Sequence, residues 1–185
     1  MFAAPLCRYM KKLFPFLLLF MAGSVFAQVK QTVTQSNITF QIKNMGFMTH
    51  GTFSGLQADI NFDPAKPEAS SINATIDANT VNTDNSMRDN HLKEDSYFDV
   101  AKYPKISIKS ISIKHKGGDS YDGQFSLTIK DKTKTVDMPF TYVETGNTGE
   151  FKGVLKIKRG DYGVGGGSMV LSSDVEIDID VKTSK

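Results

Sequence analysis

The stretch that decides the fold is Asp174-Val-Glu-Ile-Asp-Ile-Asp-Val181, near the end of the chain. Hydrophobic residues alternate there with acidic ones, and this period of two is typical of a β-strand with one buried face. The same alternation recurs through most of the chain, in the segments 38–42, 53–62, 72–78, 106–113, 125–129, 136–142 and 151–157. The pattern therefore predicts about eight strands, each with one apolar face.

Two irregularities and the connections refine this prediction. The alternation slips near Gly55, and it shifts from even to odd positions around Ser110, so that Ile111 and Ile113 continue it; such a shift indicates a β-bulge. Short turns such as Asp63-Pro64, Gly117-Gly118 and Gly146-Asn147 favour antiparallel neighbours. We expect an all-β fold, an eight-stranded antiparallel β-barrel, with a β-sandwich as the structural alternative.

Residues 79–104 interrupt the β pattern because they show no alternation. Asn85 or Ser86 can cap a short helix that runs to about Asp95. We expect a long loop with one short helix that covers an end of the barrel and acts as a gate rather than an active site. The helix should place Met87 and Leu92 on the barrel and leave Lys93 and Glu94 in water. Its far side should be anchored by Tyr97, Phe98 and Tyr103.

Residues 1–27 have the order of a secretory signal peptide. A basic start with Arg8, Lys11 and Lys12 precedes the apolar run 13–22, and small residues lead to a cleavage site after Ala27. A membrane anchor is the alternative, but the run is too short to cross a hydrocarbon core about 30 Å thick. We expect cleavage, export to the periplasm, a mature domain of residues 28–185, and no transmembrane segment after cleavage.

Removing this leader changes the charge and the cysteine content. The full chain of 185 residues has 22 basic and 20 acidic residues; the mature 158 residues retain 19 basic and 20 acidic ones. Because the charges are so nearly balanced, we do not expect the concentrated basic face of a nucleic-acid-binding protein. The one cysteine, Cys7, belongs to the leader, so the mature chain has no disulfide, thiol nucleophile or cysteine metal site.

Alternation alone does not say which face of a barrel is wet. The chain has no Trp, its aromatic residues are scattered, and it ends in Lys182-Thr-Ser-Lys185 without a terminal aromatic. These features favour a barrel with an apolar interior over an outer-membrane barrel, which carries aromatic girdles. Small inward positions leave room for a hydrophobic ligand, although an interior filled by its own side chains is the alternative; these positions are Ala58, Ala74, Ala78 and Gly153.

Two longer motifs carry a family resemblance. Ser86-Met-Arg-Asp-Asn-His-Leu92 is followed by Tyr97-Phe-Asp-Val-Ala-Lys-Tyr-Pro104, and further matching segments are Ser36–Phe40, Gly51–Gly55, Gly123–Ile129, Arg159–Gly163 and 174–181. Over about residues 30–182 the chain resembles the YceI-like family, the lipocalin-like polyisoprenoid-binding proteins of bacterial periplasms. The resemblance implies an extended barrel that binds a long isoprenoid, such as a polyprenyl or quinone-like lipid, for transport, storage or stress protection. It implies binding rather than catalysis, with no cofactor.

From the apolar faces and the helix we select ten candidate ligand-binding residues: Phe40, Phe53, Arg88, His91, Phe98, Phe125, Leu127, Met138, Phe140 and Ile177. Arg88 and His91 have two interpretations. They belong to a structural network in which Arg88 pairs with a nearby acid, or they meet the polar head of a ligand. An enzyme that acts on a small amphipathic substrate at the barrel mouth is the alternative function.

Other motifs point to structure. The three histidines, His50, His91 and His115, are too widely spaced for a zinc site. The place of Arg159 and Asp161 in the motif shared with the YceI-like family implies that they form a structural pair. The glycine-rich segment 163–168 lacks the strand–loop–helix context of a phosphate loop and is expected to be a flexible connection, and His115 an exposed hairpin residue. The sequence leaves open whether the protein is a monomer or a homodimer.

Overall fold

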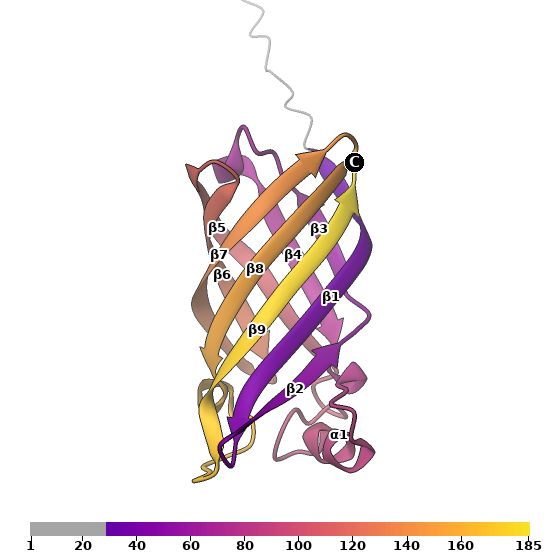
Figure 1. Ribbon diagram of the computed structural model, residues 1–185, viewed down its shortest axis with the longest axis vertical. Helices are drawn as coiled ribbons and strands as arrows, with labels where there is room; N and C mark the ends of the chain where they lie inside the picture. Colours follow the sequence, from indigo (N-terminus) through magenta and orange to yellow (C-terminus); the bar gives the residue numbers. More distant parts are fainter. Residues whose placement is uncertain (1–28) are drawn as a thin grey trace, which may run out of the picture.

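Nine antiparallel strands wrap around a common axis in the computed structural model, which describes residues 29–185 (Figure 1). The predicted leader lies outside the described residues. The elements are β1 (Lys30–Asn44), β2 (Phe47–Phe53), β3 (Gln57–Asn61), η1 (Pro67–Ala69), β4 (Ser71–Asp77), η2 (Ala78–Thr80), α1 (Ser86–Lys93), β5 (Lys105–Gly117), β6 (Ser120–Ile129), β7 (Lys132–Thr145), β8 (Thr148–Lys158), η3 (Arg159–Tyr162) and β9 (Leu171–Ser184).

The nine strands form a barrel of eight positions, as predicted. The first strand, β1, closes the barrel by pairing with β9 along almost its whole length. Its other edge pairs with β2 through residues 38–44 and with β3 at Lys30 and Gln31, so β2 and β3 lie end to end as one interrupted strand. The interruption falls at 54–56, where Gly55 has φ +74°, and this confirms the slip predicted there. The result is a closed eight-stranded antiparallel barrel.

The predicted bulge is present in β5, where the register with β6 shifts between Ser110 and Ser112. Ile111 is the extra residue, and it is 54% exposed, so the prediction that it continues the inner face is wrong. Two residues of β5 face one of β6 at a bulge, which turns the extra side chain outward. Ile113 resumes the inner face and is buried.

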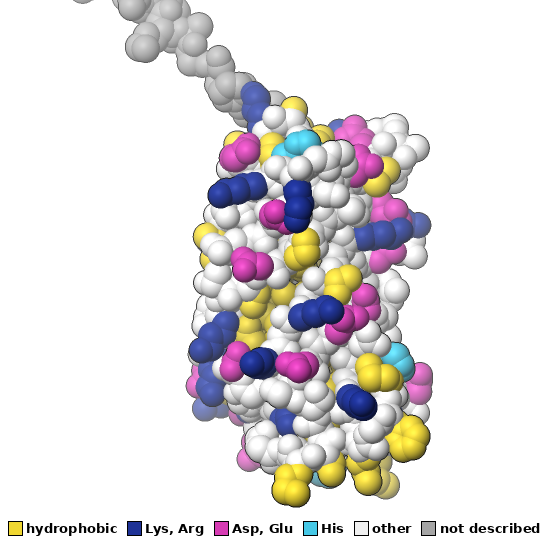
Figure 2. Space-filling view, turned by 60° about the vertical axis from the view of Figure 1, so that its left-hand side comes forward, with side chains coloured by type: hydrophobic (Ala, Val, Ile, Leu, Met, Phe, Trp, Pro, Cys, Tyr) yellow, Lys and Arg dark blue, Asp and Glu magenta, His cyan; other side chains and the backbone are white. Residues whose placement is uncertain are grey.

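The two faces of the barrel differ as the alternation predicts. On β6, Phe125, Leu127 and Ile129 are buried inside, whereas the outer wall carries charged side chains of both signs (Figure 2). Outer ion pairs link neighbouring strands, such as Lys156 Nζ to Glu176 Oε2 at 2.9 Å. Water screens such exposed pairs and they contribute little, so the apolar interior supplies most of the stabilisation.

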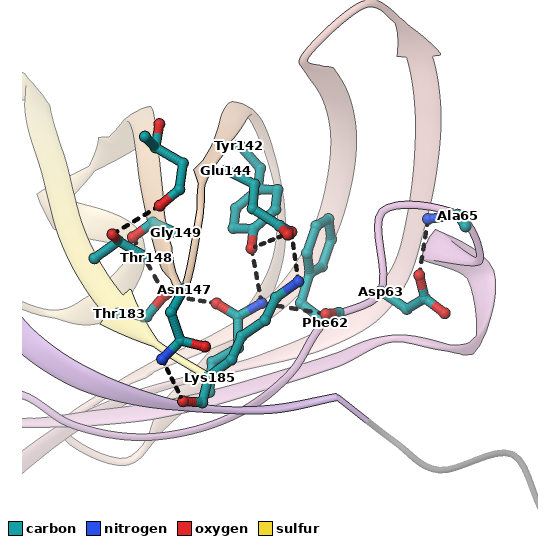
Figure 3. A network of polar contacts seen from close by, with 12 residues as sticks. Phe62, Asp63, Ala65, Tyr142, Glu144, Asn147, Thr148, Gly149, Thr183 and Lys185 are labelled. Carbon is teal, nitrogen blue, oxygen red and sulfur yellow. Dashed lines mark hydrogen bonds and ion pairs between the residues drawn. The ribbon is translucent and has the colours of Figure 1, made fainter.

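One end of the barrel is closed by aromatic rings. The ring of Phe62 packs edge-on against four others, with centroid distances of 5.2 Å to Tyr121, 4.8 Å to Tyr142, 5.3 Å to Phe151 and 6.0 Å to Phe140. A buried polar network connects Tyr142 and the backbone of Phe62 with β1 and β9 (Figure 3). Gln31 Nε2 donates to the Tyr142 hydroxyl at 3.1 Å and to the Phe62 carbonyl at 3.2 Å, and Thr183 Oγ1 donates to Gln31 Oε1 at 2.5 Å.

Tyr142 connects this network to the chain terminus. Its hydroxyl donates to Glu144 Oε2 at 3.3 Å, and that carboxylate pairs with Lys185 Nζ at 2.6 Å. Burial raises the pKa of Tyr142 to about 12, and the bond from Lys185 lowers the pKa of Glu144. Every buried polar atom named here has a hydrogen-bond partner, so burying this network at the closed end leaves none of these groups unsatisfied.

The helix α1 lies at the opposite end (Figure 1). As predicted, Asn85 is its N-cap, and its side chain accepts from Arg88 N at 3.0 Å. Leu92 is half-buried and Glu94 is exposed, as expected. Met87 is 79% exposed and Lys93 is half-buried, so both of those predictions are wrong. An eight-residue helix rests on the barrel through few side chains, and the segment after it, with Tyr97 and Phe98, supplies the main contacts.

Candidate functional site

An apolar cavity of about 570 Å³ occupies the barrel interior between the aromatic end and α1. Ligand-binding cavities of proteins are typically about 300–1,000 Å³, so this volume suits a ligand rather than a packing defect. All ten candidate residues chosen from the sequence line it: Phe40, Phe53, Arg88, His91, Phe98, Phe125, Leu127, Met138, Phe140 and Ile177. Their position around one cavity is therefore established, and their role in binding stays a prediction.

Small side chains create part of this space. Ala58 of β3 and Ala74 of β4 face each other in the register and both line the cavity, and Gly153 of β8 lines it from the opposite wall. Ala78 was expected among them, but it begins η2 and is buried outside the cavity lining. It lies beyond the end of β4, where alternation no longer determines direction.

Three aromatic rings join the helical segment to the barrel wall. The rings of Phe40 on β1 and Phe53 on β2 are 5.5 Å apart, and Phe53 meets Phe98 edge-on at 5.6 Å. Edge-on aromatic pairs contribute about 0.5–1.5 kcal/mol beyond the area they bury. This contact fixes the segment over the open end of the cavity.

Thr83 organises the polar part of the same end. Its hydroxyl donates to Asp89 Oδ1 at 2.6 Å and accepts from Arg88 Nε at 2.7 Å, while Arg88 Nη2 donates to the Thr83 carbonyl at 2.7 Å. The expected partner of Arg88 was an acid; its partner is instead a buried threonine that it shares with Asp89. Sequence reasoning missed Thr83, because a threonine in a loop carries no signal until its partners are placed.

The side chain of His91 is exposed, whereas that of Arg88 is held by hydrogen bonds to Thr83. Its side chain is 67% exposed at the mouth of the cavity, with Nε2 3.6 Å from Glu94 Oε2. The sequence allowed it to cap the helix end against the barrel, but the ring is directed toward water. Of the two polar candidates, His91 is thus the one whose ring remains accessible to a ligand.

Arg159 holds the loop on the other side of the mouth. Its buried guanidinium donates to four backbone carbonyls: Ser172 at 2.8 Å, Val164 at 2.8 Å, Gly166 at 2.8 Å and Leu171 at 3.1 Å. The expected pairing with Asp161 is wrong, because Asp161 is exposed in η3 while the Arg159 side chain turns inward. The glycine-rich segment is therefore fastened by one arginine, and Gly165 N also donates to Ser96 O at 2.8 Å.

Exposed apolar side chains surround this end. The β1–β2 hairpin, α1 and the 163–170 loop contribute them, and Met45 N donates to Val170 O at 2.9 Å to join two of these segments. The residues are Met45, Phe47, Met48, Met87, Met169 and Val170. The opposite end is sealed, so this rim marks the open mouth of the cavity. Alternation did not predict the rim, since its members lie in loops, in α1 and at the first two positions of β2.

The remaining sequence motifs lie away from the cavity. His115 is exposed in the β5–β6 hairpin, as predicted, with Nε2 2.8 Å from the Gly118 carbonyl. Among residues 29–185 no group of three His, Cys, Asp or Glu side chains is arranged to bind a metal ion. In the same range no helix is long and apolar enough to cross a membrane.

A closed antiparallel barrel with an apolar cavity that opens at one end defines a lipocalin-like ligand-binding architecture. The model of the YceI-like domain matches residues 30–183, and the chain therefore belongs to the YceI-like family. Protein YceI of Salmonella arizonae is 30% identical over 175 residues, which cover 89% of this chain and 91% of that protein. This confirms the family resemblance.

Solved structures of other proteins show the same fold. The crystal structure of Burkholderia cenocepacia BcnA is 32% identical, with a TM-score of 0.77 over 80% of this chain and 95% of that one. The Campylobacter jejuni YCEI protein is 28% identical, with a TM-score of 0.66 over 73% and 84%. A polyisoprenoid binding domain from Saccharophagus degradans, 18% identical, has a TM-score of 0.69 over 84% and 97%, and shows the shared fold.

Proposed function

We propose that this protein is a periplasmic carrier that binds one long-chain isoprenoid lipid, a polyprenyl or quinone-like molecule, inside the barrel. The observation that carries the proposal is the cavity, which is lined by apolar side chains along its length and by polar ones at its open end. The description of the Saccharophagus relative as a polyisoprenoid binding domain supports the same ligand class. Transport, storage and stress protection are all compatible roles for such a carrier.

The ligand's orientation follows from the two ends of the barrel. The far end is sealed by Phe62 and its aromatic neighbours, so the isoprenoid chain enters from the mouth and its head stays there. Burying apolar surface contributes about 25 cal/mol per Å², and the chain therefore supplies most of the affinity. His91 is the polar side chain that we assign to the head, because Arg88 is engaged by Thr83.

We also propose that the segment 86–104 acts as the gate. It crosses the mouth, and it is attached through the Phe53–Phe98 contact and the Thr83 network. Loops over an open barrel end move more readily than the strands beneath them. Opening requires these contacts to separate, together with the hydrogen bonds from Gly165 N to Ser96 O and from Lys130 Nζ to Asp95 O, without loss of a strand pairing.

Binding rather than catalysis fits the polar groups at the mouth. Arg88 and Asp89 both bond to Thr83, and His91 lies beside Glu94. A nucleophile with an adjacent base oriented by a third group is the usual signature of covalent catalysis. Arg88 and Asp89 instead hold the helix in place through Thr83.

The test is lipid co-purification with a cavity-filling variant. Protein expressed with its own leader is isolated from the periplasm, and bound lipid is identified by native mass spectrometry after extraction. Ala74→Phe projects into the cavity, whereas Lys109→Phe adds the same side chain to the outer face of the adjacent strand. We expect an isoprenoid in the wild type and in Lys109→Phe, and loss of it in folded Ala74→Phe.

Two results would refute the proposal: a wild-type protein that carries no isoprenoid, or equal lipid content in all three proteins. Phe125→Asp provides a second interior variant, since Phe125 is fully buried in the lining. Intact-mass analysis of the periplasmic protein tests the location, and the mature chain should begin at Gln28. A mass that includes Met1, in the membrane fraction, would contradict export.

A further inference from the structure

The barrel wall is split between β7 and β8. These strands pair only from Phe140–Gly153 to Thr145–Thr148, although β7 begins at Lys132 and β8 continues to Lys158. Over the same stretches β7 stays paired with β6 and β8 with β9. The split therefore separates two intact halves of the sheet, and it is not a frayed strand end.

The sequence explains where the split begins. Pro139 directly precedes the last paired residue of β7, and proline has no N–H to donate to a neighbouring strand. Gly153 stands on the other side and contributes no side chain to close the gap. A Cβ on Gly153 would lie 3.3 Å from Cβ of Phe140 and 3.5 Å from Cγ of Met138.

Side chains rather than backbone hydrogen bonds close the split. Met138 of β7 and Leu155 of β8 are buried on the inner side, and Val154 is 41% exposed on the outer side. Figure 2 brings forward the side of the barrel that is on the left in Figure 1, and it shows hydrophobic side chains inside a recess of the wall. Methionine is unbranched and flexible, so Met138 can turn aside without breaking a strand pairing.

The interior cavity and an outer groove meet at this place. The groove has a volume of about 670 Å³ and runs over the outer faces of β7, β8 and β9 past Pro139 and Val154. Four residues line both spaces: Phe140, Lys152, Gly153 and Ile179. The wall between cavity and groove is therefore thinnest at the end of the split that adjoins the Phe140–Gly153 pair.

A second interruption of pairing lies between β1 and the β2–β3 junction, but it is sealed differently. Val33 and Leu56 pack into it against the core. Ser54 N donates to Thr80 Oγ1 at 3.0 Å, and Thr80 Oγ1 donates to Ser54 O at 3.1 Å. These hydrogen bonds hold the junction to η2, whereas at the β7–β8 split the buried side chains of Met138 and Leu155 fill the inner side.

We propose that the β7–β8 split is a side exit through which the far end of a long isoprenoid chain leaves the cavity and lies in the outer groove. This inference rests on the proposed function. The sealed aromatic end blocks a straight path, so a chain too long for the cavity can extend only through a wall. Short isoprenoids fit within the cavity and do not use the exit.

A reversible cross-link tests the exit, because the mature chain has no cysteine of its own. Pro139→Cys/Val154→Cys places one thiol on each side of the split, next to the last strand pair. The matched control, Val143→Cys/Glu150→Cys, joins a directly opposed pair inside the ladder, and neither residue lines the cavity or the groove. Binding of farnesol, a short isoprenoid alcohol, and solanesol, a long one, is measured by native mass spectrometry for oxidised and reduced forms.

We expect oxidation of the Pro139→Cys/Val154→Cys protein to weaken solanesol binding by about tenfold and to leave farnesol binding unchanged. The control pair should show no difference between oxidised and reduced forms. Equal solanesol binding in both forms of the test pair would overturn the exit while leaving the proposed function intact. Parallel loss of farnesol would also overturn it, since the cross-link would then act on the cavity itself.

Two further measurements keep the inference testable if the cross-link does not form. Gly153→Leu, which fills the corner where cavity and groove meet, should lower solanesol affinity selectively; an unchanged ratio of solanesol to farnesol affinity would contradict the exit. In a single Val154→Cys variant, bound solanesol should slow maleimide labelling, and farnesol should not. Failure of the wild type to bind either alcohol would refute the proposed function instead.

Discussion

Gly51 of β2 stands opposite Phe40 of β1, and the Phe40 ring occupies the space into which a side chain at position 51 would project. A Cβ on Gly51 would lie 2.6 Å from Cε1 of Phe40 and 2.9 Å from Cγ2 of Thr83. Phe40 and Thr83 both line the cavity near its mouth. The missing side chain of Gly51 therefore determines how the wall and the helical segment fit together.

The first prediction concerns Gly51→Ala. Alanine normally stabilises a strand relative to glycine, but here the added carbon displaces the Phe40 ring, and overpacking typically costs about 1–3 kcal/mol. We expect a lower free energy of unfolding in urea and weaker ligand binding. Gly160→Ala is the control, because a Cβ there meets nothing within 4 Å. Equal stability of both variants would show that the Phe40 contact is unimportant.

Arg159→Ala should loosen the loop 163–170. Four carbonyls lose their charged donor, and we expect a loss of about 3 kcal/mol in unfolding free energy. Hydrogen exchange of the amides in 164–171 should become faster. Arg159→Lys should give exchange rates between those of the wild type and Arg159→Ala, because a lysine ammonium cannot reproduce the planar hydrogen-bonding geometry of a guanidinium. Asp161→Asn should change neither quantity. A large effect of that control would restore the Arg159–Asp161 pairing rejected above.

For Arg88→Ala we expect weaker attachment of α1 to the mouth. The Thr83 hydroxyl and carbonyl lose their donors, which costs about 1–3 kcal/mol, and a bound isoprenoid should be released faster. The measurements are hydrogen exchange in Ser86–Lys93 and ligand release rates, with the exposed Asn90→Ala as control. A lipid-hydrolysing activity that Arg88→Ala or His91→Ala abolishes, with binding and stability intact, would favour an enzyme.

The last prediction uses the closed end. Burial raises the pKa of Tyr142 to about 12 from 10.0, so its phenol favours folding fully below pH 10 and loses this contribution as the pH rises towards 12. Tyr142→Phe should cost about 1–2 kcal/mol near neutral pH, because Gln31 and Glu144 lose a partner. Its unfolding free energy should then fall less between pH 10 and 12. Parallel pH curves for both proteins would refute this assignment.

Local patterns in the sequence were enough for much of this structure. Alternation depends on which way successive side chains point, so it identified the strands, the apolar face and the break near Gly55 without tertiary information. The Asn85 cap is equally local, because it needs only neighbours within one helical turn. Alternation also supplied seven of the ten residues now found around the cavity, and the other three, Arg88, His91 and Phe98, were taken from the segment 79–104 that lacks it.

Only the tertiary structure decided what depends on contacts between distant segments. The partners of Arg88 and Arg159 are a loop threonine and backbone carbonyls, groups that carry no distinctive sequence signal. Ile111 faces outward because the β6 register places the extra residue there, and the β7–β8 split exists because the two strands diverge beyond Pro139. Closure of the barrel brings such segments together, and a period of two along one strand contains no information about its neighbour.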